Sequence, residues 1–390
     1  MKNVFILDLF SGAGGFSLGF HMAGFKPGVM IDSCTYATET LKANFGHLGG
    51  HILKEDLSKL TPARLQTYLK SNRITNSIDL IIGGPPCQGW SMAGRAKLRS
   101  LGRDQDHFFN DERNVLVKNY IRFISHFRPQ AFLMENVPGI KSYFGFNVLE
   151  YIIASFRRVG YEVSAEVLNS SHYGVPQRRE RVFLVGIRKD LGLKFEFPKP
   201  NGCKVTLRDA ISDLPIVRDG SKTEIKDYKK TSSEISEYAR IMREGASRSL
   251  IYDHICTKHR PDDVEAFKLL KEGGYYRDLP KKLKRYRDDT FFDKYTKLKW
   301  SEPSKTITAH LSKDCYSHIH PSQARTITVR EAARIQSFPD RYYFHGGMCS
   351  KFKLIGNAVP PLMGKLLAEE IKKQVFSGSK RFRDRSPTTI

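Results

Sequence analysis

Residues 4–15 read VFILDLFSGAGG, a short apolar run that ends at Asp8-Leu9-Phe10 and passes directly into a glycine-rich turn. Short β-rich runs of this kind predict a strand. Glycine lets the main chain approach a ligand closely, and open α/β folds bind ligands beyond the carboxyl ends of parallel strands. The stretch therefore predicts the first strand of an α/β domain, followed by either a ligand-binding turn or a purely structural tight turn.

Similar apolar runs recur along the first half of the chain, separated by stretches long enough for helices, at residues 28–32, 78–82, 130–135 and 181–187. Between two of these runs, apolar side chains fall at helical spacing from Leu116 to Phe127, and Pro129 ends the pattern. The alternation holds to about residue 190. It predicts βαβ units and a mostly parallel sheet.

The composition and periodicity of the sequence change after residue 190. Lysine-rich clusters such as KDYKK and KKLKRYRDD show neither helical nor strand periodicity, which predicts a second, basic, irregular domain. Helical amphipathicity returns at 329–337 and after Pro361. The last residues, 377–390, are polar and basic, and we expect a disordered tail.

The composition narrows the class of partner. The 390 residues include 64 Lys and Arg against 41 Asp and Glu, a formal charge of +23. This excess predicts a polyanionic partner, nucleic acid before membrane, since no run approaches the ~18 apolar residues of a spanning helix. The six cysteines form no CxxC pair, so neither a disulfide framework nor a zinc site is indicated. Only a four-residue apolar run precedes Asp8, so no secretory signal is evident and a cytoplasmic protein is expected.

Two acids are candidates for ligand binding along the same sheet edge. Asp32 ends the second strand about 20 residues after the glycines, the place from which a carboxylate binds a ribose hydroxyl, although an acid there is also an ordinary helix N-cap. Asp56 follows an apolar pair and is either a further ligand at this edge or a surface residue. Ser17 stands where the dinucleotide fingerprint requires its third glycine, which argues against a nicotinamide oxidoreductase.

A single thiol lies in a rigid loop after the run at 78–82. The sequence GGPPCQGWS places Cys87 after two glycines and two prolines, where a structural cysteine is less expected than in a strand or helix core. The next run ends at Glu135, so thiol and carboxylate come from consecutive strand ends. Gln177, Arg179 and Arg181 alternate in QRRER and would project to one side of an extended segment, unless the run is a solvated charged edge.

In this order, the blocks resemble those of the DNA (cytosine-5)-methyltransferase family. The resemblance covers nearly the whole chain, through DLFSGAGGFSLGF, GGPPCQGWS, ENVPG, QRRERVFLVG, RTITVREAARIQSFPD and KLIGNAVPP. It implies the Rossmann-like mixed α/β sheet of S-adenosylmethionine-dependent methyltransferases with a smaller basic target-recognition domain. The implied catalytic and cofactor-binding domain is residues 1–189, completed by 353–376, and the target-recognition domain is 190–352.

The resemblance also implies catalytic roles. Cytosine is unreactive at C5 until a nucleophile adds at C6, and Cys87 matches the family nucleophile for this covalent step. Glu135 matches the acid that contacts N3 and the exocyclic amine and so neutralises charge pushed into the ring. Arg181 matches the residue at the cytosine O2, with Arg179 and Gln177 supporting the loop.

The implied cofactor is S-adenosylmethionine, released as S-adenosylhomocysteine, and no metal is implied. The matching residues are Phe10, Gly12, Gly14, Asp32, Asp56, Leu116 and Asn357. Among them Asp32 would bind the ribose, Asp56 the adenine amine, and Leu116 would make an apolar contact. Two positions depart from the family: Asp32 is commonly Glu, and Ser33 stands where a bulky residue often packs against the adenine. Both departures would weaken cofactor affinity.

The expected partner is double-stranded DNA, whose target base must be flipped out of the helix. The basic stretch from Gln88 to Arg113 resembles the mobile loop that closes over the DNA. We expect a monomer of the bacterial restriction-modification type, with a cognate endonuclease or as an orphan, in the cytoplasm with the nucleoid. The alternatives are an RNA cytosine-5-methyltransferase, against which the large basic domain argues, and a catalytically silent DNA-binding homologue, against which the intact catalytic residues argue.

Overall fold

The computed structural model describes residues 4–74, 77–86, 112–141, 147–222, 228, 234–247, 250–284, 295–311 and 315–377. The chain divides into two compact units. Unit 1 comprises Met1–Leu168, Glu180–Lys199 and Gly364–Ile390, and unit 2 comprises Asn169–Arg179 and Pro200–Met363. This division differs from the expected domain boundaries in that residues 169–179 and 353–363 fall in unit 2 and 190–199 in unit 1. Apart from Ser377, the expected disordered tail lies outside the described residues.

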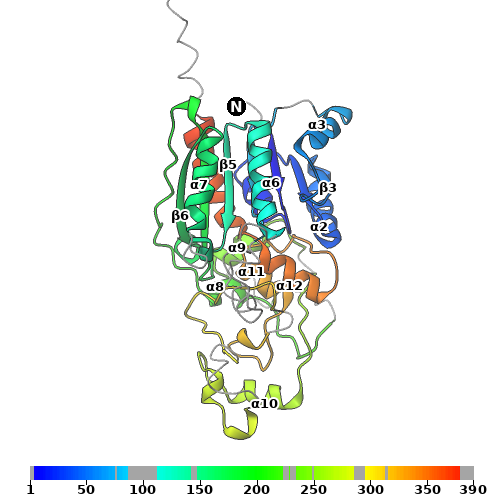
Figure 1. Ribbon diagram of the computed structural model, residues 1–390. Helices are drawn as coiled ribbons and strands as arrows, with labels where there is room; N and C mark the ends of the chain where they lie inside the picture. The colour runs from blue at the N-terminus through cyan, green and yellow to red at the C-terminus, as the bar shows by residue number, and fades with distance from the viewer. Residues whose placement is uncertain are drawn as a thin grey trace, which may run out of the picture. The chain divides into compact units, whose positions relative to one another are not determined.

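Unit 1 is built on one seven-stranded sheet (Figure 1). Its strands are β1 (Ile6–Leu9), β2 (Val29–Asp32), β3 (His51–Lys54), β4 (Leu80–Gly83), β5 (Ala131–Asn136), β6 (Tyr161–Asn169) and β7 (Glu180–Arg188). They lie in the order β3-β2-β1-β4-β5-β7-β6. The strands from β3 to β5 in this order pair in parallel, and β5 pairs antiparallel with β7. The sheet is therefore mixed, with its parallel part around β1.

Helices cover both faces of this sheet. They are α1 (Gly15–Met22), α2 (Thr35–Phe45), α3 (Pro62–Ser71), α6 (Glu112–Phe127), α7 (Val148–Arg158) and α13 (Pro361–Ile371), which begins in unit 2. Apolar residues of α3, α6 and α7 form one core with the sheet, and Figure 1 shows α6 and α7 side by side on that face. On the opposite face, Phe16 of α1 meets Phe183 of β7 edge-on at 6.5 Å between ring centres.

The five strands predicted from sequence are all present, and the helices predicted before Pro129, at 329–337 and after Pro361 are confirmed. Two strands were missed. β3 is only half covered, with exposed residues at both ends, and β6, at the edge of the sheet, has polar and exposed residues in its middle. Neither strand therefore carries the continuous apolar run that marks a strand buried on both faces.

Unit 2 has short helices and little strand pairing. Its helices are α8 (Leu207–Ile211), α9 (Glu237–Arg243), α10 (Pro261–Leu269), α11 (Val329–Ile335) and α12 (Met348–Asn357). Strand pairing among its described residues is limited to isolated bridges, such as that between Gln177 and Ser304. Side chains also hydrogen-bond backbone groups in this unit. Lys297 Nζ donates to the carbonyls of Phe267 and Leu270 at the end of α10, each at 2.9 Å.

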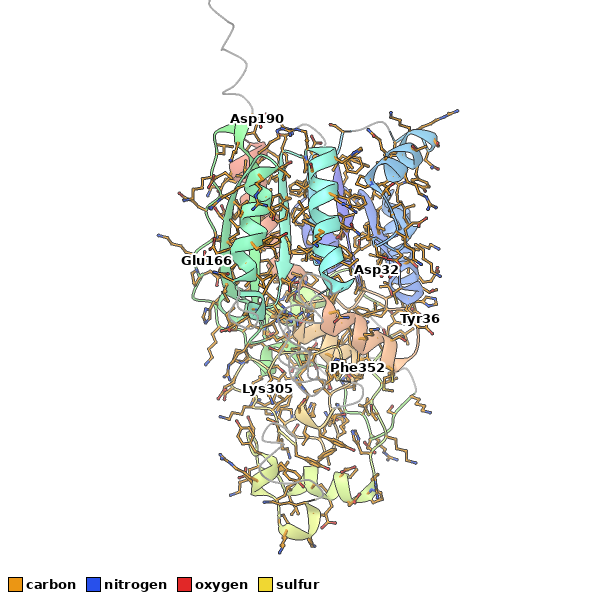
Figure 2. The ribbon with its side chains drawn as sticks, in the orientation of Figure 1. Asp32, Tyr36, Glu166, Asp190, Lys305 and Phe352 are labelled. Carbon is orange, nitrogen blue, oxygen red and sulfur yellow. The ribbon has the colours of Figure 1, made fainter. Side chains whose placement is uncertain are left out.

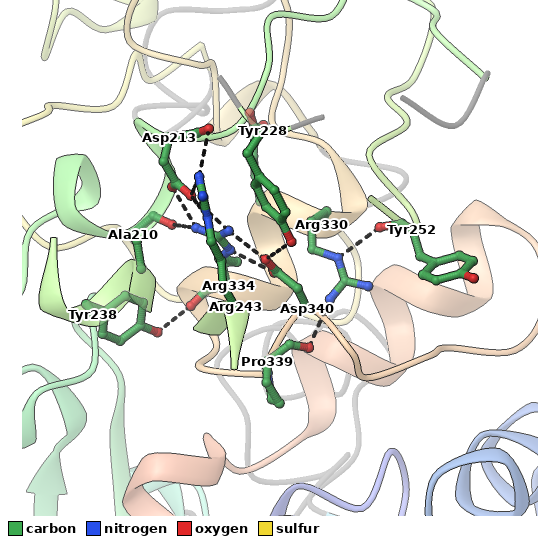
Figure 3. Close-up of polar contacts among 12 residues, drawn as sticks. Ala210, Asp213, Tyr228, Tyr238, Arg243, Tyr252, Arg330, Arg334, Pro339 and Asp340 are labelled. Carbon is green, nitrogen blue, oxygen red and sulfur yellow. Dashed lines mark hydrogen bonds and ion pairs between the residues drawn. The ribbon is translucent and has the colours of Figure 1, made fainter. Parts of the chain in front are cut away.

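Helix α11 carries charged side chains into the interior of unit 2. Arg334 is fully buried and donates to both carboxylate oxygens of Asp213, at 2.7 and 3.1 Å, and of Asp340, at 2.8 and 2.6 Å (Figure 3). Burial by itself would raise the pKa of Asp340, but the charge of Arg334 holds it below its ordinary value. The hydroxyl of Tyr228 adds a bond to Asp340 at 2.8 Å. This buried cluster joins α11 to the segments that precede and follow it.

A second buried ion pair fixes the start of α11. Arg325 donates to both oxygens of Glu331 at 2.8 Å, and Glu331 also accepts from the backbone N–H of Thr328 at 2.7 Å. The Thr328 hydroxyl in turn accepts from the N–H of Glu331, which completes a capping box. Sequence and packing thus agree on where this helix begins.

We predict that Arg334→Met destabilises unit 2 by about 3–5 kcal/mol, because it leaves Asp340 buried without its paired cation and Asp213 with Arg243 as its remaining ion pair. The matched control is Arg240→Met, which removes an equal charge from an exposed position on α9. Urea unfolding followed by circular dichroism measures both. Equal midpoints for the two variants would contradict a stabilising role for the buried cluster.

Candidate active site

The register of the sheet in unit 1 brings four strand ends to one edge. Leu9 lies opposite both Ile31 and Gly83, and Gly83 lies opposite Met134. The next residues along these strands, which stand at that edge, are Phe10, Asp32, Gly84 and Glu135. Figure 2 shows Asp32 at this end of the sheet, away from Asp190, which follows the antiparallel strand β7. The glycine-rich turn, Asp32, the start of the GGPPC loop and Glu135 thus leave the sheet at one edge.

The glycine-rich turn has a backbone that few residues adopt. Phe10, Gly12 and Gly14 have φ angles of 61°, 54° and 73°, in the left-handed region. Glycine adopts this region freely, whereas for Phe10 it costs about 1–2 kcal/mol. Ser11 holds the turn in place, donating from its N–H to Ile31 O at 3.0 Å and accepting from the N–H of Ile31 at 3.1 Å. The turn ends at the N-terminus of α1, where backbone N–H groups favour a polar or anionic ligand.

The two predicted cofactor acids are both held by backbone N–H groups. Asp32 accepts from Gly12 through Oδ2 and from Cys34 through Oδ1, each at 2.8 Å, so it is tied to the glycine turn. Asp56 accepts the N–H and the hydroxyl of Ser58 on Oδ1, at 2.9 and 2.7 Å, and these bonds lower its pKa. A carboxylate has about four acceptor sites, so Asp56, which accepts both bonds on Oδ1, retains capacity for a ligand. Leu116, on α6, is partly buried.

Asp8 is a functional candidate that the sequence reasoning missed. Its side chain is buried at the end of β1, with Oδ2 accepting from the Ser17 hydroxyl at 2.6 Å and Oδ1 without a hydrogen-bond partner in the described structure. Burial raises the pKa of Asp8 to about 7; the bond from Ser17 opposes the shift, and the charge of Asp32 adds to it. The signal was available in the sequence, because an acid interrupts an otherwise apolar strand.

Glu135 and Arg181 form the charged part of the site. Arg181 Nε lies 2.9 Å from Glu135 Oε1, and both side chains are mostly buried. The angles are not those of a hydrogen bond, and Oε1 has no hydrogen-bond donor among the described residues. Gly84 faces this carboxylate closely: a Cβ there would lie 3.1 Å from Glu135 Oε2. The pair is brought together because β7 runs antiparallel to β5, with Val182 opposite Asn136.

Asn136 connects this carboxylate to the loop of the predicted nucleophile. Its Nδ2 donates to the carbonyl of Pro85 at 3.2 Å, and its Oδ1 accepts from the N–H of Val137 at 2.9 Å. Cys87 itself, together with the stretch expected to form the DNA-covering loop up to residue 111, lies outside the described residues. The structure thus describes the loop as far as Pro86, next to the predicted nucleophile.

The other predicted site residues belong to unit 2. Gln177 and Arg179 are almost fully buried, so the alternative of a solvated charged edge is wrong for them. Arg179 donates to Ile307 O at 3.1 Å and to Ala358 O at 2.9 Å, whereas Arg181 pairs with Glu135 in unit 1. The three alternating side chains therefore have separate partners instead of one shared face. Asn357 ends α12. Its contact with the cofactor stays a prediction.

Comparison with solved structures defines the class of fold. The chain matches a putative DNA modification methyltransferase encoded within a prophage (E. coli) with a TM-score of 0.75 and 27% identity, over 96% of this chain and 99% of that one. DNMT2 of Spodoptera frugiperda matches with a TM-score of 0.59 and 18% identity, over 96% and 99%, which concerns the fold alone. The fold is that of S-adenosylmethionine-dependent methyltransferases, as predicted.

The sequence comparisons define the family. The pattern of the C-5 cytosine-specific DNA methylases matches residues 4–373. The type II methyltransferase M.DdeI of Desulfomicrobium norvegicum is 35% identical over 390 residues, 94% of this chain and 88% of that protein. M.Bpa9945I of Bacillus paralicheniformis, also a type II methyltransferase, is 32% identical over 94% of this chain and 98% of its own length. The chain belongs to the C-5 cytosine-specific DNA methylase family and is a DNA (cytosine-5)-methyltransferase.

None of its described helices is long and apolar enough to cross a membrane.

We predict that Asp8 makes the stability of unit 1 depend on pH. The folded carboxyl holds its proton up to about pH 7, whereas the unfolded one loses it near 3.8, so stability falls as pH rises between these values. The loss from pH 5 to 7 is about 2 kcal/mol, and Asp8→Asn should abolish it. Urea midpoints at both pH values test this. Asp190→Asn, an exposed acid with a lowered pKa, serves as the control, and an Asp8→Asn variant with the slope of the parent would refute the assignment.

Proposed function

We propose that this enzyme transfers a methyl group from S-adenosylmethionine to C5 of a flipped-out cytosine in a specific duplex DNA sequence, through a covalent bond between Cys87 and C6. The observation that carries the proposal is the Glu135–Arg181 pair at the sheet edge, tied through Asn136 to the loop that leads to Cys87. A carboxylate, a guanidinium and a thiol are the three groups that activation of cytosine at C6 requires.

The roles follow from the chemistry of the base. Attack by the Cys87 thiolate on C6 pushes electrons towards N3 and O2 of the ring. Glu135, whose Oε1 lacks a hydrogen-bond donor in the described structure, would accept from the exocyclic amine and supply a proton or hydrogen bond at N3. Arg181, beside it, would donate to O2 and stabilise the same charge. After methylation, the C5 proton is lost to solvent, the C5–C6 double bond re-forms and the C6–S bond breaks, which releases the Cys87 thiolate.

The glycine edge of unit 1 fits the cofactor. The main chain at Gly12 and Gly14 leaves room for close approach, Asp32 is fixed against this turn to accept ribose hydroxyls, and Asp56, held ionised by Ser58, would accept from the adenine amine. Phe10 and Leu116 offer apolar contact, and Asn357 is proposed to complete the pocket. S-adenosylmethionine, when bound, supplies an electrophilic methyl group on its sulfonium. No metal takes part in the proposal.

Duplex DNA is the proposed substrate, with residues 190–352 as the target-recognition region. Its lysine and arginine residues would bind phosphates and set affinity, while a smaller number of contacts to base edges would set the recognised sequence. We propose a monomer that works in the cytoplasm on chromosomal DNA, paired with a restriction endonuclease, since its relatives are type II methyltransferases.

The test is to incubate the protein with S-adenosylmethionine and unmethylated plasmid, and to map 5-methylcytosine by sequencing. We expect modification within one short motif, and none with Cys87→Ser, because an alcohol is a far weaker nucleophile than a thiolate. Methylation by Cys87→Ser would remove Cys87 from its role. Absence of methylation of the plasmid by the parent protein would refute the proposed activity on DNA, and methylation of structured RNA instead would support the RNA alternative.

Glu135→Gln should lower turnover by about 10²–10³-fold, because an amide keeps the shape of the side chain but loses its charge and its capacity to protonate N3. Glu166→Gln, an exposed change on β6, is the matched control (Figure 2). Single-turnover methylation rates at saturating cofactor separate this effect from binding. Equal rates for the two variants would exclude Glu135 from the chemistry.

A further inference from the structure

Three segments of unit 2 meet at one carbonyl oxygen. Ala358 O accepts from Arg179 Nη2 at 2.9 Å and from Gln336 Nε2 at 2.5 Å. The first donor belongs to the loop that continues to Arg181, and Ala358 directly follows Asn357. Gln336, which lies just after α11, had no role in the sequence analysis. The proposed cytosine-binding loop and the proposed cofactor turn are thus joined at Ala358.

The side-chain amide of Gln336 forms several hydrogen bonds. Its Nε2 also donates to Ile355 O at 3.1 Å, and its Oε1 accepts from Gln177 Nε2. Gln177 Oε1 in turn accepts from the N–H of Ile307 at 2.8 Å, and Arg179 donates to the carbonyl of the same residue. These bonds form a closed ring that links residues 177–179, Ile307 and residues 355–358. Within this ring, Gln336 joins residues 177–179 to residues 355–358.

Burial makes this ring rigid. Gln336 and Gln177 are 0% exposed and Arg179 is 1% exposed, so water does not compete for these bonds. Close packing of two backbone segments adds to this rigidity. The main chain of Thr308 lies so near Gly356 that a Cβ at this position would clash with it. Loss of the Gln336 amide would leave Ala358 O with Arg179 alone and Ile355 O without this donor, in a place where an unsatisfied polar group is costly.

We propose that Gln336 is a positioning residue for both halves of the reaction. By fixing Ala358 O, it sets the place of Asn357, the proposed cofactor residue, and of the segment from Arg179 to Arg181, which is proposed to bind the cytosine. This inference rests on the proposed function. It predicts that one substitution far from both ligands in the sequence lowers cofactor affinity and turnover together.

The first test compares Gln336→Met with Gln323→Met. Both changes remove a polar amide at similar volume in unit 2, but Gln323 bonds to Val217, His320 and Arg325, outside the ring. Calorimetry measures S-adenosylhomocysteine binding without DNA, and single-turnover methylation measures the rate. For Gln336→Met we expect S-adenosylhomocysteine to bind at least about five-fold more weakly and the methylation rate to fall by a similar factor. Each effect corresponds to the loss of about one hydrogen bond. For Gln323→Met we expect both within about two-fold.

A change in stability with unaltered affinity and rate in Gln336→Met would overturn the proposal, as would equal effects of the two variants. Hydrogen exchange of the full chain gives a readout independent of activity. In Gln336→Met, backbone amides at 177–181 and 355–360 should exchange faster together, and in Gln323→Met they should not. If the parent protein neither binds cofactor nor methylates, the proposed function fails, whereas the exchange result still decides whether Gln336 joins the two segments.

Gln336→Glu provides a second variant in case Gln336→Met does not fold. The ionised carboxylate would repel Ala358 O, but burial raises the pKa of such a group, and its protonated form regains one donor. Its cofactor affinity relative to the parent should therefore improve as the pH is lowered from 8 to 6. A ratio that does not change with pH would contradict a donor role for this side chain.

Discussion

The pairing of β1 with β2 on one side and β4 on the other is the constraint on which the site depends. This pairing puts Leu9 level with Ile31 and Gly83. The glycine turn, Asp32 and the start of the predicted nucleophile loop therefore leave the sheet at one level. β5 adds Glu135 through the same parallel register, and the antiparallel strand β7 adds Arg181. A slip of one residue would turn each side chain to the other face.

Unit 2 is held together in a different way. With only isolated bridges among its described residues, it relies on buried polar groups: Arg334 between two carboxylates, Arg325 on Glu331, and the hydrogen bonds around Ala358. Such interactions depend on direction and distance more than apolar contacts do. A unit fixed in this way can hold irregular segments around a rigid centre without regular strand pairing.

The part of the candidate site at the sheet edge was predictable from sequence, because the glycine turn, Asp32, the GGPPC loop and Glu135 come at the ends of apolar runs, and parallel strands end at a common edge. The strand β6 was missed because the exposed polar residues in its middle hide the apolar pattern. The place of Arg179 in unit 2 was also missed, since its partner Ala358 lies 179 residues further along the chain. The pKa of Asp8 depends on the burial that the whole fold creates, which no local pattern encodes.

Unit 1 is assembled from separate stretches of the chain, and this affects its synthesis. Helix α13 lies against α1, where a Cβ on Gly364 would be 3.4 Å from Gly15 O, and Lys372 donates to Ala23 O across 349 residues. At roughly 5–20 residues per second, a ribosome needs about 20 to 70 seconds to make the intervening chain. During that time α1 lacks its covering helix on the nascent chain. The methyltransferase therefore completes unit 1 only after unit 2 has emerged.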